Sequence, residues 1–422
     1  MAIRTAAQRP LEGPAAVLLL GNYRPTIALV RTLKPLGYRV IVGLGGGEGG
    51  AQYSRFVDEV WDHPPLASGA DRFVAALAAV LRRRPDIRVV LPVAEEFVRA
   101  VSDARDALPA DRSYAVPSRA VIDATLDKAA LWRLATSVGV PVAPYAVTRT
   151  RGELRDACAT VGYPVVLRPF ESTRRLYGRK AIVVGSAEEL AATCPAWPAE
   201  QTAILVQRWV RGARHNIYFA ARAGRIVRIV EAVIDRTDEP DATGLAVEGR
   251  TVPASEDLLT FTGRLTGALD YTGVGCAQFL VDRDVGAVHL LEINARIAGN
   301  HAVAEAAGLE LGPLAIRLAA ADPPDVPFVA GKPGLVYAWT YGDVRGLVVA
   351  RREGRISRRE AVRWCARVVR TITRARVHMT WRWDDPMPTV VLYGRHVPGL
   401  SRLVGRRVRP PLWLPTALSA AD

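Results

Sequence analysis

The sequence has few cysteines and no long apolar run, and these shortages exclude several classes of protein. Its four cysteines, Cys158, Cys194, Cys276 and Cys365, are far apart and form no CxxC pair, so they predict neither a structural zinc site nor a disulfide framework. A reducing cytosol is the expected compartment. The longest apolar stretches, such as 15–20, fall well short of the about 20 residues that a membrane-spanning helix needs. We therefore expect no segment to cross a bilayer.

The amino-terminal end also lacks the features of a secretory signal. Arg4 and Arg9 precede an apolar segment at 14–20, but this segment is short and has no small-residue cleavage site. We expect a flexible leader that runs into a first strand. The chain of 422 residues, with 50% hydrophobic residues, is long enough for two or three domains with sizeable cores.

Lysine is absent from Thr340–Asp422, where the positive charge of the chain is concentrated in arginine. This stretch has 17 arginines and six acidic residues, so it carries a net charge of +11 out of the +14 of the whole chain. A basic region of this kind suits a nucleic acid or an anionic membrane surface. The segment RREGRISRREAVRWCARVVRTITRARVHMTWRW could form a helix with apolar residues near one side and arginines around the rest. Such a helix fits an anionic lipid surface at least as well as it fits a phosphate backbone. The apolar residues are Ile356, Ala361, Trp364, Val368 and Ile372.

The first 120 residues alternate apolar strands with amphipathic stretches, and this βαβα rhythm predicts a parallel sheet covered by helices. The expected strands are AVLLLG, RVIVGL and IRVVLPV, and the expected helices are 26–36, 72–83 and 95–107. Gly45 to Gly50 match GxGxxG, but they follow the second strand rather than the first, so a flexible loop is favoured over a dinucleotide site. Glu95 and Glu96 lie at the carboxyl end of a strand, where they could bind a cationic substrate group or simply begin a solvated helix.

A second unit begins near Asp127, where LDKAALWRLATSVGVP predicts a helix with Leu126, Ala130, Leu131 and Leu134 on one face. Prolines after 320 mark a linker, and the rest is basic. The expected division is 1–120 for an α/β domain, 121–320 for a second domain with a lid at about 145–210, 321–339 for the linker and 340–422 for the Arg-rich region.

The stretch LLEINAR begins as a buried apolar strand but carries Glu292, Asn294 and Arg296. Side chains alternate faces along a strand, so these three polar groups point the same way. A hairpin that pairs Asp282 with Val288 would place Gln278 of the preceding strand opposite Glu292.

Glutamate, asparagine and glutamine supply the hard oxygen ligands that suit Mg²⁺, and an adjacent arginine could neutralise charge on a transferred phosphoryl group. The alternative is an edge strand whose polar face is only solvated, with Glu292 and Arg296 as a surface ion pair. Two further cations, Arg168 at the end of PVVLRP and Lys180 on the strand that follows, either hold an anionic ligand or extend into solvent. Spacing alone does not decide between these alternatives.

The order of the motifs DK, PVVLRP, LVQRWVRG, AQFLVD and LLEINAR resembles the ATP-grasp superfamily, in particular its branch with carbamoyl-phosphate synthetase and biotin carboxylase. The resemblance covers about Ala15 to Ala320. It implies an α/β protein in which an ATP-grasp fold of two α+β subdomains follows a Rossmann-like parallel α/β domain, with a small basic carboxy-terminal region after them.

The resemblance also implies a set of site residues. Magnesium, with Mn²⁺ as an alternative, would be bound by Gln278, Glu292 and Asn294. Arg296 would lie beside the transferred phosphoryl group. The ATP contacts implied are Lys128, Arg168 and Lys180 for the phosphates, Gln207, Trp209 and Val210 for the adenine, and His215 for the ribose.

The activity implied by the resemblance is that of an ATP- and Mg²⁺-dependent carboxylate ligase. A small-molecule carboxylate would take the γ-phosphate to give an acyl phosphate, which an amine- or thiol-type substrate captures, with ADP and phosphate as products. Two departures from the family pattern are Ala295 in place of proline and a lid loop, FESTRRLYGRK, that has arginines in place of glycines. A third is Arg208, where the family commonly has an acidic residue or lysine, and this change is expected to be tolerated.

The departure in the lid loop motivates a second hypothesis, an ATP-binding adaptor without ligase activity. A third is a basic protein that binds an anionic membrane or nucleic acid, the latter being less favoured. The expected location is cytoplasmic, with a peripheral position at the inner face of the membrane as a second expectation. The sequence gives no signal of oligomeric state.

Overall fold

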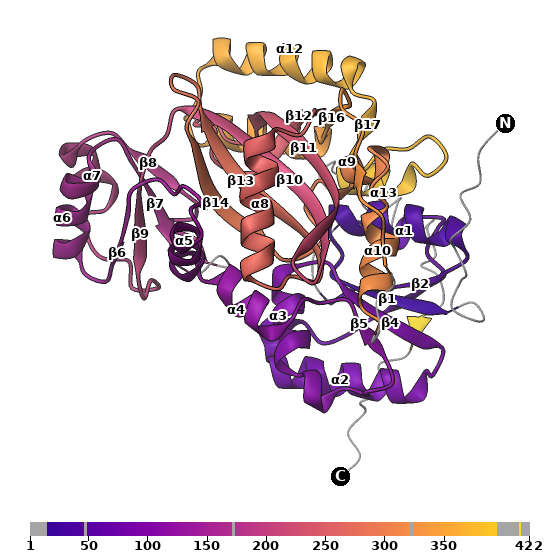
Figure 1. Cartoon of the computed structure of the whole chain (residues 1–422). Helices are drawn as coiled ribbons and strands as arrows, with labels where there is room; N and C mark the ends of the chain where they lie inside the picture. The colour runs from indigo at the N-terminus through magenta and orange to yellow at the C-terminus, as the bar shows by residue number, and fades with distance from the viewer. Residues whose placement is uncertain (1–14, 46–48, 171–173, 321–324, 395–412, 415–422) are drawn as a thin grey trace. The chain divides into compact units, whose positions relative to one another are not determined.

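The computed structural model describes residues 15–45, 49–170, 174–320, 325–394 and 413–414 (Figure 1). The expected leader and the middle of the glycine-rich stretch lie outside these residues. The chain divides into two compact units. One comprises the described residues of Met1–Val116, Gly312–Pro324 and Thr380–Asp422, and the other comprises those of Pro117–Leu311 and Asp325–Met379.

The first unit is built on a six-stranded parallel sheet in the order β18-β3-β2-β1-β4-β5. Its strands are β1 (Ala16–Leu20), β2 (Arg39–Gly43), β3 (Glu59–Trp61), β4 (Ile87–Pro92), β5 (Ser113–Tyr114) and β18 (Trp413–Leu414). Every residue of β1 is buried, as expected of a strand covered on both faces. The predicted parallel α/β architecture is confirmed.

The first unit also contains helices and 3₁₀ turns. They are α1 (Arg24–Leu33), α2 (Ala70–Arg83), α3 (Glu95–Asp103), α10 (Leu311–Leu318) and α13 (Met387–Gly394), with 3₁₀ turns η1 (Lys34–Leu36), η2 (Ala51–Tyr53), η3 (Leu66–Ser68) and η4 (Arg105–Ala107). The expected helix at 26–36 is α1 continued by η1, and the one at 95–107 is α3 followed by η4, with a break near Ala104.

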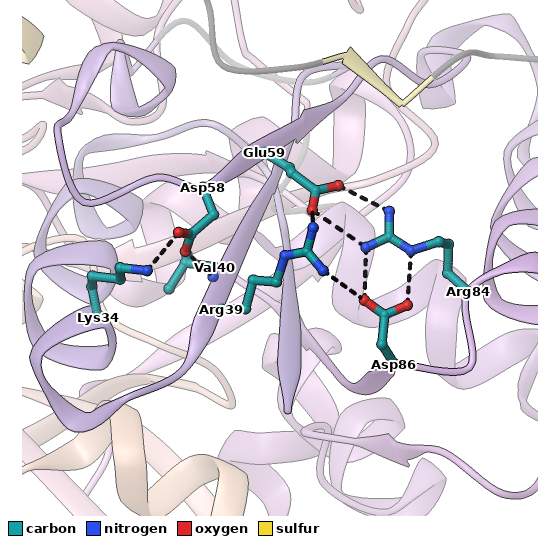
Figure 2. A network of polar contacts seen from close by, with 7 residues as sticks. All are labelled: Lys34, Arg39, Val40, Asp58, Glu59, Arg84 and Asp86. Atoms are coloured by element: carbon teal, nitrogen blue, oxygen red, sulfur yellow. Dashed lines mark hydrogen bonds and ion pairs between the residues drawn. The ribbon is translucent and has the colours of Figure 1, made fainter. Parts of the chain in front are cut away.

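A closed ring of ion pairs holds the amino ends of three strands together (Figure 2). Arg39 begins β2, Glu59 begins β3, and Asp86 immediately precedes β4. Arg84 Nη1 lies 2.9 Å from Glu59 Oε2 and its Nη2 lies 2.7 Å from Asp86 Oδ2. Arg39 completes the ring by pairing with both acids. This edge of the sheet is structural, so the carboxyl edge remains for a ligand.

Arg84→Met is expected to lower the free energy of unfolding by about 1–2 kcal/mol, because the buried Glu59 carboxylate would retain only Arg39 as its partner. The matched control is Arg99→Met, which breaks an exposed i,i+4 pair with Asp103 and should cost less than about 0.5 kcal/mol. Urea unfolding followed by circular dichroism measures both. Equal losses in the two variants would contradict a structural role for the ring.

The second unit contains two mainly antiparallel sheets. The large, eight-stranded sheet has the order β14-β13-β10-β11-β12-β16-β17, with β15 beside β11, and the small sheet has the order β6-β9-β7-β8. The large sheet consists of β10 (Gly212–Arg222), β11 (Arg225–Thr237), β12 (Ala246–Val252), β13 (Gly273–Asp282), β14 (Val288–Asn294), β15 (Val329–Ala330), β16 (Val336–Ala338) and β17 (Val377–His378). The small sheet consists of β6 (Tyr145–Thr148), β7 (Val165–Pro169), β8 (Ile182–Val184) and β9 (Ile204–Arg208).

Each sheet of the second unit has helices on one face. In Figure 1, α6 and α7 lie beside the small sheet and α8 lies across the large one. The helices of this unit are α4 (Arg119–Leu126), α5 (Lys128–Ser137), α6 (Arg151–Val161), α7 (Ala187–Thr193), α8 (Glu256–Ala268), α9 (His301–Ala306), α11 (Thr340–Arg352) and α12 (Arg358–Arg374). No helix in the described ranges combines the length and apolarity needed to cross a membrane.

The face by which α5 packs differs from the prediction. Its buried residues include Leu131, Trp132 and Ala135, whereas Ala130 and Leu134 are only half-buried. The predicted face was wrong because it continued through Leu126, which belongs to a separate helix. Asp127 separates α4 from α5 by accepting a hydrogen bond from Ala130 N at 2.9 Å as the N-cap of α5. The capped restart fixes Lys128 as the first residue of α5.

Candidate active site

The hairpin formed by β13 and β14 places Gln278 opposite Glu292, as the sequence predicted. The predicted starting pair, Asp282 with Val288, is wrong, because Val288 pairs with Val281 instead. The one-residue difference is absorbed by a bulge at Leu291, which has no partner in the register on β13. Because of the bulge, Gln278 pairs with Glu292 although the first pair of the hairpin is shifted by one residue.

A row of three polar side chains crosses the large sheet at this point. Asn216 of β10 pairs with Gln278 of β13, which pairs with Glu292 of β14, so all three lie on one face. Asn294 lies on the same face, opposite Cys276. The opposite face, which includes Ile217 and Ile293, packs into the apolar core with α5 and α8.

Asn216 is a site residue that the sequence reasoning missed. It is 6% exposed, and its Oδ1 atom is buried without a hydrogen-bond partner in the described structure. The sequence contained a signal for it. Ile217 and Phe219 alternate along the strand and point into the core, so Asn216, one residue before Ile217, must point to the opposite face. Its position beside Gln278 depends on the pairing of β10 with β13, which are far apart in sequence.

Glu292 is surrounded by positive charge. Lys128 Nζ lies 3.8 Å from Glu292 Oε2, and Asn294 Nδ2 donates to Glu292 Oε1 at 2.9 Å. Burial alone would raise the pKa of Glu292, but the charge of Lys128, the bond from Asn294 and the charges of Arg168 and Lys180 outweigh it and lower the pKa to about 2. The carboxylate is thus ionised and available as a metal ligand at neutral pH.

Arg296 extends this polar line beyond the end of β14. Its Nη2 donates to Asn294 Oδ1 at 2.8 Å, and its Nη1 donates to the carbonyl of Ile297 at 3.0 Å. Glu292, Asn294 and Arg296 are consequently linked in sequence order by hydrogen bonds. Because cations from α5 and the small sheet also act on Glu292, this face is an assembled cluster rather than a solvated edge with one ion pair.

The small sheet contributes Arg168 and Gln207 from adjacent strands. Val166 of β7 pairs with Gln207 of β9, and Arg168 follows two residues later, so the three share a face. The opposite face packs against α6 and α7 in a separate core. Gln207 Nε2 and Arg168 Nε are buried without hydrogen-bond partners in the described residues. Burial lowers the pKa of Arg168, and the charge of Glu292 opposes this effect.

The remaining predicted ATP contacts lie at different places. The Trp209 amide donates to the carbonyl of Pro164 at 3.0 Å, and Val210 follows it, half-buried, before β10. Lys180 was predicted to lie on a strand, but it is exposed and precedes the first residue of β8, Ile182, by two residues. His215 points to the face opposite Asn216, where its Nδ1 lies 2.6 Å from Glu231 Oε1. The structure thus does not bring His215 to the polar face, and its ribose contact stays a prediction.

The arginines of the lid loop contact protein carbonyls. Arg174 donates to the carbonyl of Glu200, and Arg175 Nη1 donates to that of Gly178 at 3.1 Å. Residues 171–173 of this loop lie outside the described part of the chain.

In the first unit, Glu96 of α3 accepts a hydrogen bond from Tyr23 at 2.5 Å, and cation binding there stays a prediction.

The donor set fits a hard divalent cation. Gln278, Glu292 and Asn294 present side-chain oxygens on one face, and the unpartnered Oδ1 of Asn216 lies in the same row. The described residues contain no cluster of three or more histidine, cysteine or acidic side chains that could bind a metal. A magnesium ion here would therefore take its other ligands from phosphate or water.

Residues 127–325 match the family model of the carbamoyl-phosphate synthase L chain, ATP binding domain. This segment is an ATP-grasp domain. The match begins at Asp127, the N-cap of α5, and contains the small sheet and strands β10 to β14 of the large sheet, which carry the polar row. The predicted ATP-grasp family and its carbamoyl-phosphate synthetase-like branch are confirmed.

Solved structures and curated proteins match a larger share of the chain than residues 127–325. N5-carboxyaminoimidazole synthetase from Staphylococcus aureus complexed with ADP is 12% identical with a TM-score of 0.60, covering 77% of this chain and 82% of that one. A biotin carboxylase-beta-gamma-ATP complex from Campylobacter jejuni is 18% identical with a TM-score of 0.57, covering 74% and 72%. These likenesses show the fold.

Among curated proteins, a putative urea carboxylase from Emericella nidulans is 22% identical over 348 residues, which cover 77% of this chain and 27% of that protein. A urea amidolyase from Saccharomyces cerevisiae is 24% identical, covering 73% of this chain and 17% of that protein. The chain thus spans well under two thirds of the length of these relatives.

Proposed function

We propose that this protein is an ATP- and Mg²⁺-dependent carboxylate ligase. The observation that carries the proposal is the convergence on one carboxylate of cations from α5 and the small sheet. Lys128, Arg168 and Lys180 all lower the pKa of Glu292, which lies in a row of oxygen ligands on the large sheet. A nucleoside triphosphate with a bound metal supplies the complementary charges for this arrangement.

Magnesium would be held by Gln278, Glu292 and Asn294, with Mn²⁺ as an alternative ion. When bound, the metal would screen the negative charge of the phosphates so that a second anion can approach. Asn216 is positioned to support this set through the row that it shares with Gln278 and Glu292. The donor chemistry supports the assignment.

The cations of the domain would bind and orient the phosphates. Lys128 is 7% exposed at the start of α5, so it would offer a fixed ammonium with little competition from water. Arg168 would use its unpartnered Nε atom from the small sheet. Arg296 would stabilise charge on the transferred phosphoryl group, because it extends the polar line past Asn294.

Transfer would proceed directly to the substrate carboxylate, without a covalent enzyme intermediate. Cys276 lies on the polar face beside Asn294, but burial and the nearby charge of Glu292 raise the pKa of its thiol to about 12. It is therefore protonated at neutral pH and a poor nucleophile. The products would be ADP and an acyl phosphate, which an amine or thiol captures with release of phosphate.

The adenine would lie against the inner face of the small sheet. Gln207 Nε2 is a buried donor that has no acceptor among the described residues, and an adenine ring nitrogen would supply one. Trp209 and Val210 follow it along the chain and would line the same slot, and His215 would lie toward the ribose.

The intact polar row favours the ligase over the adaptor hypothesis, which requires no metal ligands.

Calorimetric titration of the full chain with ATP, in Mg²⁺ and in EDTA, tests this proposal first. We expect binding that depends on Mg²⁺, followed by ADP release when a panel of small carboxylates and amines is added. No ATP binding in Mg²⁺ would overturn the ligase proposal. Binding without ADP release from any carboxylate, in a panel broad enough to include amino acids and bicarbonate, would instead favour the adaptor.

Asn216→Ala is expected to raise the Mg²⁺ concentration for half-maximal ATP turnover by about tenfold, because it removes a polar neighbour of the metal ligands. Gln207→Ala is the contrasting variant: it should raise KM for ATP and leave the Mg²⁺ requirement unchanged. Steady-state ADP formation across Mg²⁺ and ATP series measures both. An unchanged Mg²⁺ requirement in Asn216→Ala would remove Asn216 from the site.

A further inference from the structure

Helix α12 has three sectors, and one of them packs against other described residues of the chain. Trp364, Val368 and Thr371 form the packed sector, spaced by three or four residues along the helix. Figure 1 shows α12 along the outer edge of its unit, and its neighbours are α11 and β16. Trp364 Nε1 donates at 2.6 Å to Asp343 of α11, a buried carboxylate that also pairs with Arg236. The helix is therefore held in a fixed orientation.

The second sector is apolar and faces solvent. Val362, Val369 and Ile372 are 68%, 62% and 41% exposed, and Cys365 and Ala366 between them are also exposed. At about 100° per residue, these positions fall on one side of the helix. We call this set the apolar sector of α12. Two further exposed valines, Val348 and Val349, lie on the adjacent α11.

The third sector borders the apolar one and is made of arginine. We call it the arginine sector, and all its members are exposed: Arg359, Arg363, Arg367, Arg370 and Arg374. Glu360 is the one acidic residue of the helix, and it forms a capping box with Ser357 at the amino end. The outward surface of α12 therefore combines an apolar strip with a parallel strip of positive charge.

We infer that α12 is a docking surface for an anionic lipid membrane. The arginine sector would attract acidic headgroups, while the apolar sector would enter the boundary between headgroups and acyl chains. A nucleic-acid backbone would match only the charge, because it offers nothing apolar to Val362, Val369 and Ile372. The inference does not rest on the proposed ligase activity, so either can fail without the other.

The chain supplies its own probe for this inference. Cys365 lies in the apolar sector and is exposed, whereas Cys158, Cys194 and Cys276 are buried. A thiol-reactive, environment-sensitive fluorophore should therefore label Cys365 in the folded full-length protein. With vesicles of phosphatidylcholine and phosphatidylserine, we expect a blue shift of its emission that salt reverses. With phosphatidylcholine alone or with polyuridylate, we expect no shift. Absence of the shift with the acidic vesicles at low salt would overturn the inference.

Two double variants separate the contributions of the sectors in vesicle sedimentation of unlabelled protein. Arg363→Glu/Arg370→Glu should weaken binding at least about tenfold, and Val362→Ser/Val369→Ser should weaken it about threefold or more on the same vesicles. The controls are Arg155→Glu and Val285→Ser, exposed residues elsewhere that should leave binding unchanged. Circular dichroism verifies that each variant folds.

Charge-dependent vesicle binding that the valine substitutions leave intact would overturn insertion of the apolar sector. Binding of polyuridylate in the absence of vesicle binding would overturn the membrane as the partner and favour a nucleic acid. ATP binding by all four variants should match the wild type, because none of these residues lies on the polar face of the ATP-grasp domain.

Discussion

Glu292→Gln is expected to lower kcat for ATP turnover by at least about 10³-fold, equivalent to about 4 kcal/mol of transition-state stabilisation. The substitution keeps the size and hydrogen-bonding capacity of the side chain but removes its charge. Because Glu292 is the single carboxylate of the proposed ligand set, the variant would present only neutral oxygens to the metal. Loss of the metal would leave the phosphates unscreened.

The experiment is coupled measurement of ADP formation by wild type and Glu292→Gln over a range of Mg²⁺ concentrations. Glu188→Gln is a suitable control, because Glu188 is an exposed carboxylate at the start of α7. It should turn over ATP like the wild type. If Glu292→Gln retains more than a tenth of wild-type kcat at saturating Mg²⁺, Glu292 does not bind the essential metal.

The polar row on β13 and β14 was largely predictable from the sequence because it depends on strand periodicity. Polar residues at alternate positions in LLEINAR required one polar face, and the short connection to the preceding strand brought Gln278 opposite Glu292. The bulge at Leu291 was not predictable, since no local signal distinguishes it from a regular strand. The correct polar pair was reached through a starting pair that is off by one residue.

Features set by long-range pairing escaped prediction. Asn216 joins the row only because β10 pairs with β13, and the same pairing turns His215 to the opposite face.

In α12, the sequence suggested that Ile372 shares a face with Trp364 and Val368, whereas Thr371 is buried and Ile372 is exposed. Which apolar stripe of a helix is buried depends on the tertiary surface that it meets, and an Arg-rich helix with two such stripes leaves the choice open.

Acidification is expected to remove a second, separate contribution of Glu292, namely its stabilisation of the folded chain. Its pKa is about 2 in the folded protein against an ordinary value of 4.5. A lowered folded-state pKa stabilises the fold at pH values above the unfolded-state pKa, and this stabilisation is lost as the pH falls toward the folded-state pKa. The shift corresponds to about 3 kcal/mol, lost between about pH 5 and pH 2.

Urea unfolding of wild type and Glu292→Gln at a series of pH values isolates this contribution from the other carboxylates. At pH 7 the variant should be less stable by about 3 kcal/mol, because Lys128, Arg168 and Lys180 then repel one another without a counter-ion. Near pH 2 the two proteins should unfold at nearly the same urea concentration. A difference in stability that does not change with pH would show that the carboxylate is not held by these cations.

Added ATP without metal should stabilise the variant more than the wild type, since its phosphates would supply the missing negative charge to the same three residues.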